Sequence, residues 1–184
     1  MRLENKNAII TGATGGIGFA TVSKYLDEGA NVMMVGRSED KLVEVNNRLG
    51  KPNNAAFCVA ESTDEIAIRD SVQKTKDTFG SVDIVIANAG TEGVVQPLVD
   101  YSVQDFNHTL TVNVTGVWLY FKYAIPHMEN QGYGSIVAVA SGAGVVGFPG
   151  LCPYSASKHA VCGMVKTACL EYGEKGIRFN ALAP

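Results

Sequence analysis

Short apolar runs alternate with longer amphipathic stretches along most of the chain. The runs have few polar residues at alternate positions, which is typical of strands covered on both faces of a sheet. They predict strands at Ala8–Thr11, Val32–Val35, Ala55–Ala60, Val82–Ala87, Ile136–Val139 and Ile177–Leu182. Helices are predicted between them at Ile17–Glu28, Glu39–Leu49, Glu65–Phe79, Val103–Asn130 and Tyr154–Gly173. This alternation predicts an α/β fold with a doubly wound, Rossmann-like parallel sheet of six strands, the last at or near an edge.

The composition predicts one domain over residues 1–184. The chain is 46% hydrophobic and 18% charged, which is enough apolar material for a core, and it has no repeat or shift in composition. Its net charge is −3, and its basic residues form no stripe. We therefore expect neither nucleic acid nor a membrane as a partner.

The N-terminal segment and the cysteines bear on the compartment. No apolar run near Met1 is long enough for a signal peptide or a membrane span. The four cysteines form no C-x-x-C pair, and no Cys/His cluster has the spacing of zinc ligands. We expect a cytoplasmic protein with reduced thiols and no metal site.

A glycine-rich turn follows the first predicted strand and precedes the first predicted helix. In this turn Gly12 permits a tight bend, Gly16 lets the backbone approach a pyrophosphate, and Gly18 lets helix and strand pack closely. Unpaired N–H groups at the helix start would bind the anion. An ordinary glycine-rich turn is the alternative for this loop taken alone.

A second glycine motif, Gly142–Gly147, matches the pattern G-x-G-x-x-G to the letter. It is followed by Phe148, Pro149 and Gly150, which cannot open a helix. We therefore interpret this segment as a flexible active-site loop that binds no phosphate.

Three polar residues form a possible catalytic group. Ser141 lies at the end of a predicted strand, and Tyr154 and Lys158 lie at the start of the last long predicted helix. Residues four apart share a helix face, so the Lys158 ammonium can stabilise a phenolate at Tyr154. Lowering a phenol's pKa from about 10 towards neutrality requires roughly 4 kcal/mol of differential stabilisation. Taken alone, a Tyr/Lys pair is more typical of an exposed helix face.

Together these motifs resemble the short-chain dehydrogenase/reductase family, and the likeness covers the whole chain. The family pattern T-G-x-x-x-G-x-G appears at Thr11–Gly18, N-A-G at Asn88–Gly90, and Y-x-x-x-K at Tyr154–Lys158, preceded by Ser141. Several motifs in the right order are far more specific than any one of them.

The resemblance implies a role for each matching residue. Tyr154 would be the general acid or base, Lys158 would lower its pKa and hold the nicotinamide ribose, and Ser141 would bind the substrate oxygen. Asn113 would help to hold a proton-relay water, with a satisfied core amide as the alternative. The implied cofactor contacts are Gly12, Thr14, Gly16, Ile17, Gly18, Arg37, Asn88, Ala89, Gly90, Tyr154 and Lys158.

The end of the second strand bears on which dinucleotide binds. Gly36 occupies the position of the carboxylate that would take the ribose hydroxyls, and Arg37 follows it. This resembles the members that use NADP(H), and NAD is the alternative. Against NADP(H), position 15 is basic in some NADP users and is Gly15 here. An ordinary surface arginine before a helix is the alternative for Arg37.

Three features depart from the family pattern. Ala87 replaces an Asn, which predicts one missing loop hydrogen bond, and Glu61–Ser62 replaces an Asp and an apolar residue near the adenine site. The sequence ends at Pro184, before the segment that carries the substrate-covering loop in relatives. We therefore expect the chain as given to be truncated and to lack most of the substrate lid.

Two function classes follow from these residues. The first is an oxidoreductase that transfers a hydride between NADP(H) and a small alcohol or ketone; the second is a non-catalytic dinucleotide-binding sensor or scaffold subunit. Residues 91–102 and the segment Gly142–Pro153 would line an apolar substrate pocket. The helices Val103–Asn130 and Tyr154–Gly173 carry more apolar surface than one sheet face should cover. Since relatives pair these helices across a two-fold axis, we expect a homodimer or homotetramer.

Overall fold

Six parallel strands form one sheet in the computed structural model, which describes residues 1–184. The strands are β1 (Asn7–Thr11), β2 (Asn31–Gly36), β3 (Ala55–Val59), β4 (Ile84–Ala87), β5 (Gly134–Val139) and β6 (Ile177–Leu182). Their order is β3-β2-β1-β4-β5-β6, so the predicted doubly wound sheet is confirmed and β6 is an edge strand. The strand order reverses between β1 and β4, where ligands bind in folds of this type.

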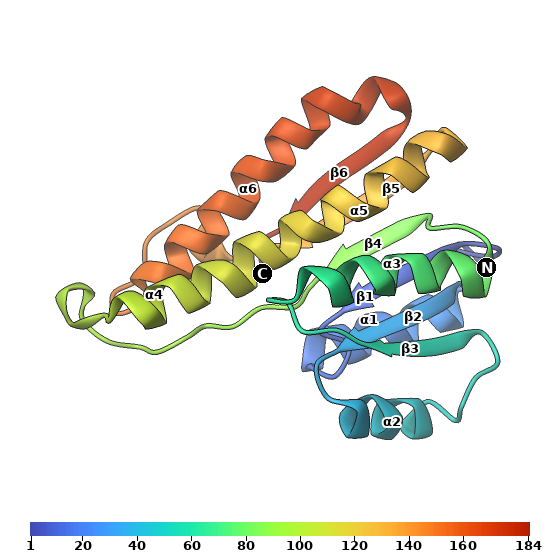
Figure 1. Ribbon diagram of the computed structural model, residues 1–184, viewed down its shortest axis with the longest axis horizontal. Coiled ribbons are helices and arrows are strands. Elements are labelled where there is room, and N and C mark those ends of the chain that lie inside the picture. The colour runs from blue at the N-terminus through green and yellow to red at the C-terminus, as the bar shows by residue number, and fades with distance from the viewer.

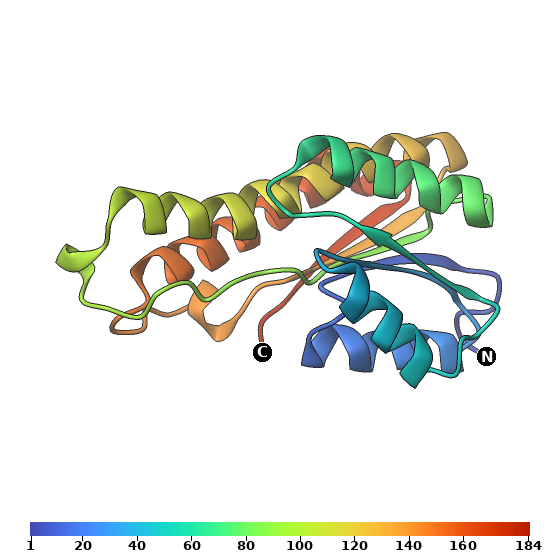
Figure 2. The same ribbon diagram turned by 60° about the horizontal axis from the view of Figure 1, so that its bottom comes forward.

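Helices cover the two faces of the sheet unequally (Figures 1 and 2). Two helices lie on one face, α1 (Gly16–Asp27) and α2 (Glu39–Arg48). The other face carries α3 (Glu65–Phe79), α5 (Gly116–Gln131) and α6 (Cys152–Tyr172), with α4 (Val103–Leu110) leading into α5. No helix combines the length and the apolar character that crossing a membrane would require.

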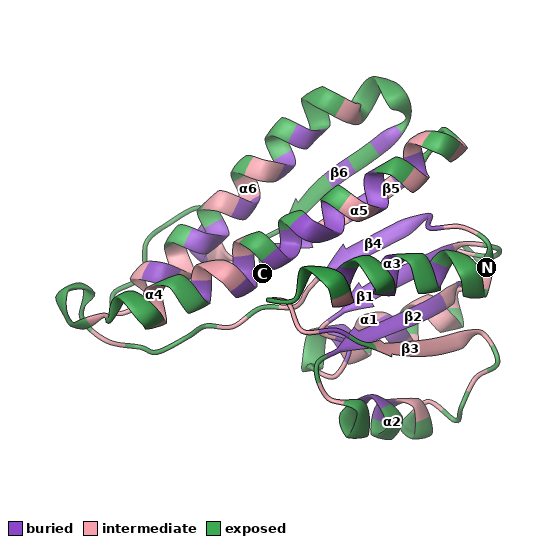
Figure 3. Cartoon of the chain, in the orientation of Figure 1, coloured by how far each residue is buried: buried purple, intermediate pink, exposed green.

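Each face of the sheet has its own core. Because neighbouring strand residues point to opposite faces, Ile10 packs with Val22 and Leu42 in the core under α1 and α2. Ile9 packs in the larger core on the opposite face, which includes Phe121 of α5. Both faces of β1, β2 and β4 are therefore buried, which explains their continuous apolar runs (Figure 3).

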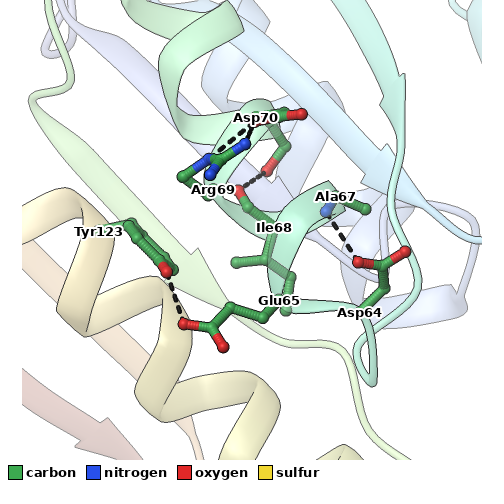
Figure 4. Close-up of polar contacts among 8 residues, drawn as sticks. Asp64, Glu65, Ala67, Ile68, Arg69, Asp70 and Tyr123 are labelled. Carbon is green, nitrogen blue, oxygen red and sulfur yellow. Dashed lines mark hydrogen bonds and ion pairs between the residues drawn. The ribbon is translucent and has the colours of Figure 1, made fainter.

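Polar contacts fix the start of α3 and attach it to α5 (Figure 4). The Asp64 carboxylate caps the helix by accepting a hydrogen bond of 3.0 Å from the Ala67 N–H. Glu65 Oε1 accepts hydrogen bonds from the Tyr123 hydroxyl and the Lys122 ammonium, each at 2.6 Å. These contacts hold the helix layer together beside the first half of the sheet.

The predicted helix Val103–Asn130 differs from the structure in its interior. A π-helical turn at Thr111–Thr115 separates α4 from α5, and Asn113 lies within this turn. A π turn inserts one extra residue into the helical ladder, so side chains before and after it change their facing. Residues 111–115 carry no residue type that distinguishes a π turn from an α turn, which is why the sequence pattern did not show it.

The two long helices were predicted to leave apolar side chains uncovered, and this prediction is wrong for about half of those side chains. Val117 and Phe121 of α5 and Val161, Val165 and Ala168 of α6 are buried within the single chain. They pack against β4, β5 and β6 in the larger core. Trp118 remains 46% exposed and lines a groove between α5 and α6.

Candidate active site

A cavity of about 510 Å³ opens at the carboxyl ends of β1 and β4, where the strand order reverses. The β1–α1 turn, the ends of β2 and β3 and the loop after β4 line it. Every predicted cofactor contact outside the Tyr154–Lys158 pair lies on its wall, namely Gly12, Thr14, Gly16, Ile17, Gly18, Arg37, Asn88, Ala89 and Gly90. The cavity also has lining residues that the sequence did not single out, including Lys41, Thr91, His108, Val112 and Tyr120.

The glycines of the β1–α1 turn differ in what surrounds them. Gly12 has a φ of +62°, and a Cβ atom there would lie 2.9 Å from Asn88 Nδ2. A Cβ atom on Gly18 would collide with the carbonyl oxygen of Gly12, whereas one on Gly16 would meet nothing within 4 Å. The start of α1 is therefore open towards the cavity, and its free N–H groups fit the pyrophosphate of a dinucleotide.

Thr11 joins the two strands that flank the cavity. Its buried hydroxyl accepts hydrogen bonds from the Asn88 N–H at 2.9 Å and the Ala89 N–H at 2.8 Å. Asn88 Nδ2 donates to the Thr11 carbonyl oxygen at 3.0 Å. The sequence identified Thr11 only as the first letter of a motif, because the role of its hydroxyl depends on a strand more than seventy residues away.

Lys158 is buried beside Tyr154 in the first turns of α6. Its side chain is only 4% exposed, and Nζ donates a hydrogen bond of 2.7 Å to the Val139 carbonyl oxygen. Nζ lies 5.6 Å from the centroid of the Tyr154 ring. The alternative of an exposed Tyr/Lys pair is therefore wrong. Burial lowers the pKa of Lys158 to about 8, because desolvation disfavours the ammonium.

Asn113 connects the π turn to two neighbouring segments. Its Oδ1 accepts from the Thr91 N–H and its Nδ2 donates to the Thr91 carbonyl oxygen, both at 2.8 Å. Nδ2 also donates to Ser157 Oγ at 3.0 Å, and Ser157 donates to the Tyr154 carbonyl oxygen at 2.7 Å. A Cβ atom on Gly90 would lie 3.1 Å from Asn113 Oδ1 and 3.5 Å from Lys158 Nζ. Asn113, Lys158 and the N-A-G segment therefore meet at one place.

Ser141 lies at the carboxyl end of β5 and is not hydrogen-bonded to Tyr154 or Lys158. Its hydroxyl accepts from the Ala143 N–H at 3.2 Å, at the start of a short 3₁₀ turn formed by residues 142–144. A Cβ atom on Gly144 would lie 2.8 Å from the Lys158 carbonyl oxygen. The second glycine motif thus packs against α6 and lines no part of the 510 Å³ cavity.

Two cationic side chains lie at the mouth of the cavity beyond β2. Arg37 follows the strand, Lys41 lies in the first turn of α2, and both are exposed and form no ion pair. Glu61, at the end of β3, lines the same cavity and accepts a hydrogen bond of 3.1 Å from the Ser62 N–H.

Comparison with known proteins decides the family. The model of the short chain dehydrogenase family matches residues 6–184. Short-chain dehydrogenase reductase 3a of Arabidopsis thaliana is 38% identical over this whole chain, which spans 72% of the relative's length. This chain belongs to the short-chain dehydrogenase family. Glucose 1-dehydrogenase of Gluconobacter oxydans is 37% identical, and this chain spans 70% of its length.

Solved structures of short-chain dehydrogenases share the same arrangement. Levodione reductase superposes with a TM-score of 0.96 at 32% identity, and NAD⁺-bound xylitol dehydrogenase with 0.96 at 33%. Both matches include all of this chain and cover 72% and 71% of the other chains. The family consists of NAD(P)-dependent oxidoreductases, and the open turn at Gly16 fits such a cofactor.

Proposed function

We propose that this short-chain dehydrogenase interconverts an alcohol and a ketone with NADP(H), and that Tyr154 is its general acid and base. The buried Lys158 ammonium beside the Tyr154 ring carries the proposal. A cation in a site with little water stabilises a phenolate strongly, and a helix that only supported the fold would gain nothing from burying an ammonium. A purely dinucleotide-binding sensor or scaffold would not need this pair.

The chain's own residues would act on the substrate oxygen. In the reductive direction the carbonyl carbon would take up a hydride, which a bound nicotinamide would supply. The Tyr154 hydroxyl donates its proton to the carbonyl oxygen, and the Ser141 hydroxyl donates a hydrogen bond to the same oxygen. Lys158 stabilises the phenolate that remains, and Asn113 holds the water through which Tyr154 regains a proton. Ser157 positions Tyr154 by linking its carbonyl oxygen to the Asn113 amide.

The mouth of the cavity favours NADP(H) over NAD(H). Arg37 and Lys41 place two unpaired cations beyond β2, where a 2′-phosphate would lie, and Gly36 supplies no carboxylate for the ribose hydroxyls. Arg37→Ala should weaken NADPH binding by about 1.5–3 kcal/mol and leave NADH nearly unchanged. Lys166→Ala removes an exposed cation from α6 and serves as the matched control. Equal losses for both cofactors in the Arg37 variant would contradict the assignment.

The test of the proposed activity is an assay of the protein with NADPH and a panel of ketones. Oxidation of NADPH that depends on both ketone and protein supports an enzyme. A change in NADPH fluorescence on binding, without turnover of any ketone or of any alcohol with NADP⁺, would instead support the sensor or scaffold class.

We also propose that the protein forms a homodimer or homotetramer through α5 and α6. A groove with a volume of about 500 Å³ runs between these helices and includes the exposed Trp118, together with Pro126, Met164 and Tyr172. The groove is also lined by Lys122, Glu129 and Glu171, and an open groove with an apolar centre and a charged rim on two adjacent helices is typical of an interface. Light scattering should therefore give at least twice the mass of 19.5 kDa. A monomer at tens of micromolar would contradict this assembly.

A further inference from the structure

Two loops on the substrate side of the proposed active site expose an unusual number of apolar side chains. One is the loop of residues 91–102 between β4 and α4, and the other is the loop of residues 142–151 between β5 and α6. They run side by side at one end of the molecule (Figures 1 and 2), and most of their residues are exposed (Figure 3). Their exposed large apolar residues are Val94, Val95, Leu98, Val99, Val145, Val146 and Phe148.

Hydrogen bonds make the two loops one structure, which we call the two-loop wall. The Gly150 carbonyl oxygen accepts from the Gln96 N–H at 3.1 Å and from the Tyr101 hydroxyl at 2.7 Å. The Tyr101 hydroxyl also lies 2.5 Å from the Val94 carbonyl oxygen. Gly150 has a φ of +78°, and a Cβ atom there would lie 3.2 Å from Val95 Cγ1, so the loops meet closely at this point.

The two-loop wall is attached to the proposed catalytic residues. One loop begins at Thr91, whose backbone is hydrogen-bonded twice to Asn113. The other begins next to Ser141 and ends at the start of α6, which carries Tyr154. A substrate whose carbonyl oxygen reaches Tyr154 and Ser141 would therefore place its remaining atoms against this wall.

The distribution of charge on the two-loop wall favours uncharged substrates over anionic ones. Residues 91–102 contain two carboxylates, Glu92 and Asp100, and no lysine, arginine or histidine, and residues 142–151 contain no charged residue. An anionic substrate would find no cation on these two loops and would be repelled by Glu92 and Asp100. A polyol would exchange hydrogen bonds with water for contacts with valine, leucine and phenylalanine, which costs free energy.

We infer that the substrate is an uncharged ketone or secondary alcohol with a bulky hydrocarbon part, which packs against the two-loop wall. This rests on the proposed function of the same site. Burying hydrocarbon gains about 0.8 kcal/mol for each CH₂ group, so the wall would increase the catalytic efficiency with substrate size. Tyr101 is a positioning residue in this account, because it holds the wall together without touching the reacting atoms.

Ketones with one shared ring and different substituents test the inference. We would measure kcat/KM with NADPH for cyclohexanone, tert-butylcyclohexanone, hydroxycyclohexanone and oxocyclohexanecarboxylate. We expect the tert-butyl compound to exceed each of the others by at least tenfold, because three methyl groups leave water. The highest efficiency with the hydroxy or carboxylate compound would overturn the inference and leave the proposed oxidoreductase function standing.

Variants connect that preference to the wall. Phe148→Ser should reduce the tert-butyl preference at least threefold and leave the affinity for NADPH unchanged, because Phe148 lies outside the 510 Å³ cavity. Tyr101→Phe should raise the KM for the tert-butyl compound severalfold at a similar kcat. Ile66→Ser, which removes an exposed apolar side chain from α3, should change none of these values. If Phe148→Ser lowers the mass in solution but not the ketone preference, the wall is an interface between copies, and the inference is wrong.

A binding measurement separates failure of the inference from failure of the proposed function. If no ketone oxidises NADPH, the proposed function fails, and the inference is decided by NMR titration of each ketone into the protein with NADP⁺. Binding of the tert-butyl compound at least tenfold tighter than the carboxylate, weakened by Phe148→Ser, would support the apolar site without turnover. Equal or absent binding of all four compounds would overturn it.

Discussion

The two glycine motifs have similar letters and different structures. In each motif a Cβ atom on one glycine would collide with a backbone carbonyl oxygen, on Gly18 in the first and on Gly144 in the second. Each also contains one glycine with nothing within 4 Å, Gly16 and Gly147. The first motif opens α1 and lines the 510 Å³ cavity, whereas the second forms a 3₁₀ turn and packs against α6.

The two motifs differ because a helix begins within the first motif, whereas the next helix begins several residues after the second. Glycine allows the backbone to approach a neighbour, and a helix that starts at the turn supplies the unpaired N–H groups that bind an anion. Phe148 and Pro149 delay the next helix to Cys152, so the second motif presents no such start beside its glycines.

The largest effect is expected from alanine at the two packed glycines. Gly18→Ala forces the β1–α1 turn apart, and Gly144→Ala displaces α6 at Lys158, so each should cost about 3 kcal/mol of stability. Gly18→Ala should also abolish NADPH binding at temperatures where the variant is folded, whereas Gly144→Ala should only weaken it through Lys158. Thermal unfolding and NADPH titration measure the two quantities. Abolished NADPH binding in both variants would show that the two motifs do not differ in function.

An effect of similar size, confined to a range of pH, is expected from the lysine beneath the second motif. Lys158 has a pKa of about 8 in the folded protein and about 10.5 when unfolded, because burial disfavours its ammonium. Between these values the unfolded chain binds more protons, so the free energy of unfolding should rise with pH, by roughly 3 kcal/mol in total. Below pH 8 Lys158 is charged in both the folded and the unfolded state, so the full free-energy cost of burying its ammonium is present. Lys158→Met should remove this rise in denaturant titrations, and an unchanged slope would contradict a dry ammonium.

The smallest effect on stability is expected at the two glycines in open space. Gly16→Ala should leave the melting temperature nearly unchanged and weaken NADPH binding about tenfold or more, since the new methyl group lies where the pyrophosphate approaches. Gly147→Ala is the matched control and should alter neither quantity. If both variants bind NADPH like the wild type, the cofactor does not approach Gly16.

The sequence was sufficient for the fold and for the location of the cofactor cavity. Continuous apolar runs required a covered parallel sheet, and the glycine turn lay at the strand whose neighbours reverse the order. The π turn at Thr111–Thr115 could not be predicted, because its residue types suit an α turn equally well. The roles of Thr11 and Ser157 depend on partners distant in the chain, and a local pattern carries no information about them.

The assembly prediction shows a different limit of the sequence. Apolar residues on α5 and α6 indicated an interface, but a sequence does not say which neighbours cover them. Most of these residues pack against the chain's own strands, and Trp118 beside the open groove is the part that still indicates a partner.

The resemblance to short-chain dehydrogenases was specific because separate motifs agreed in order along the whole chain.

The most direct test of the account is single-turnover oxidation of NADPH by Tyr154→Phe in the presence of a ketone, together with the NADPH dissociation constant. Tyr25→Phe is the control, because the Tyr25 hydroxyl on α1 makes no hydrogen bond and lies outside the cavity. The account predicts that Tyr154→Phe slows hydride transfer at least a hundredfold, the range for loss of a general acid, while NADPH affinity changes only a few fold. A rate above a tenth of the wild-type rate would show that Tyr154 is not the proton donor.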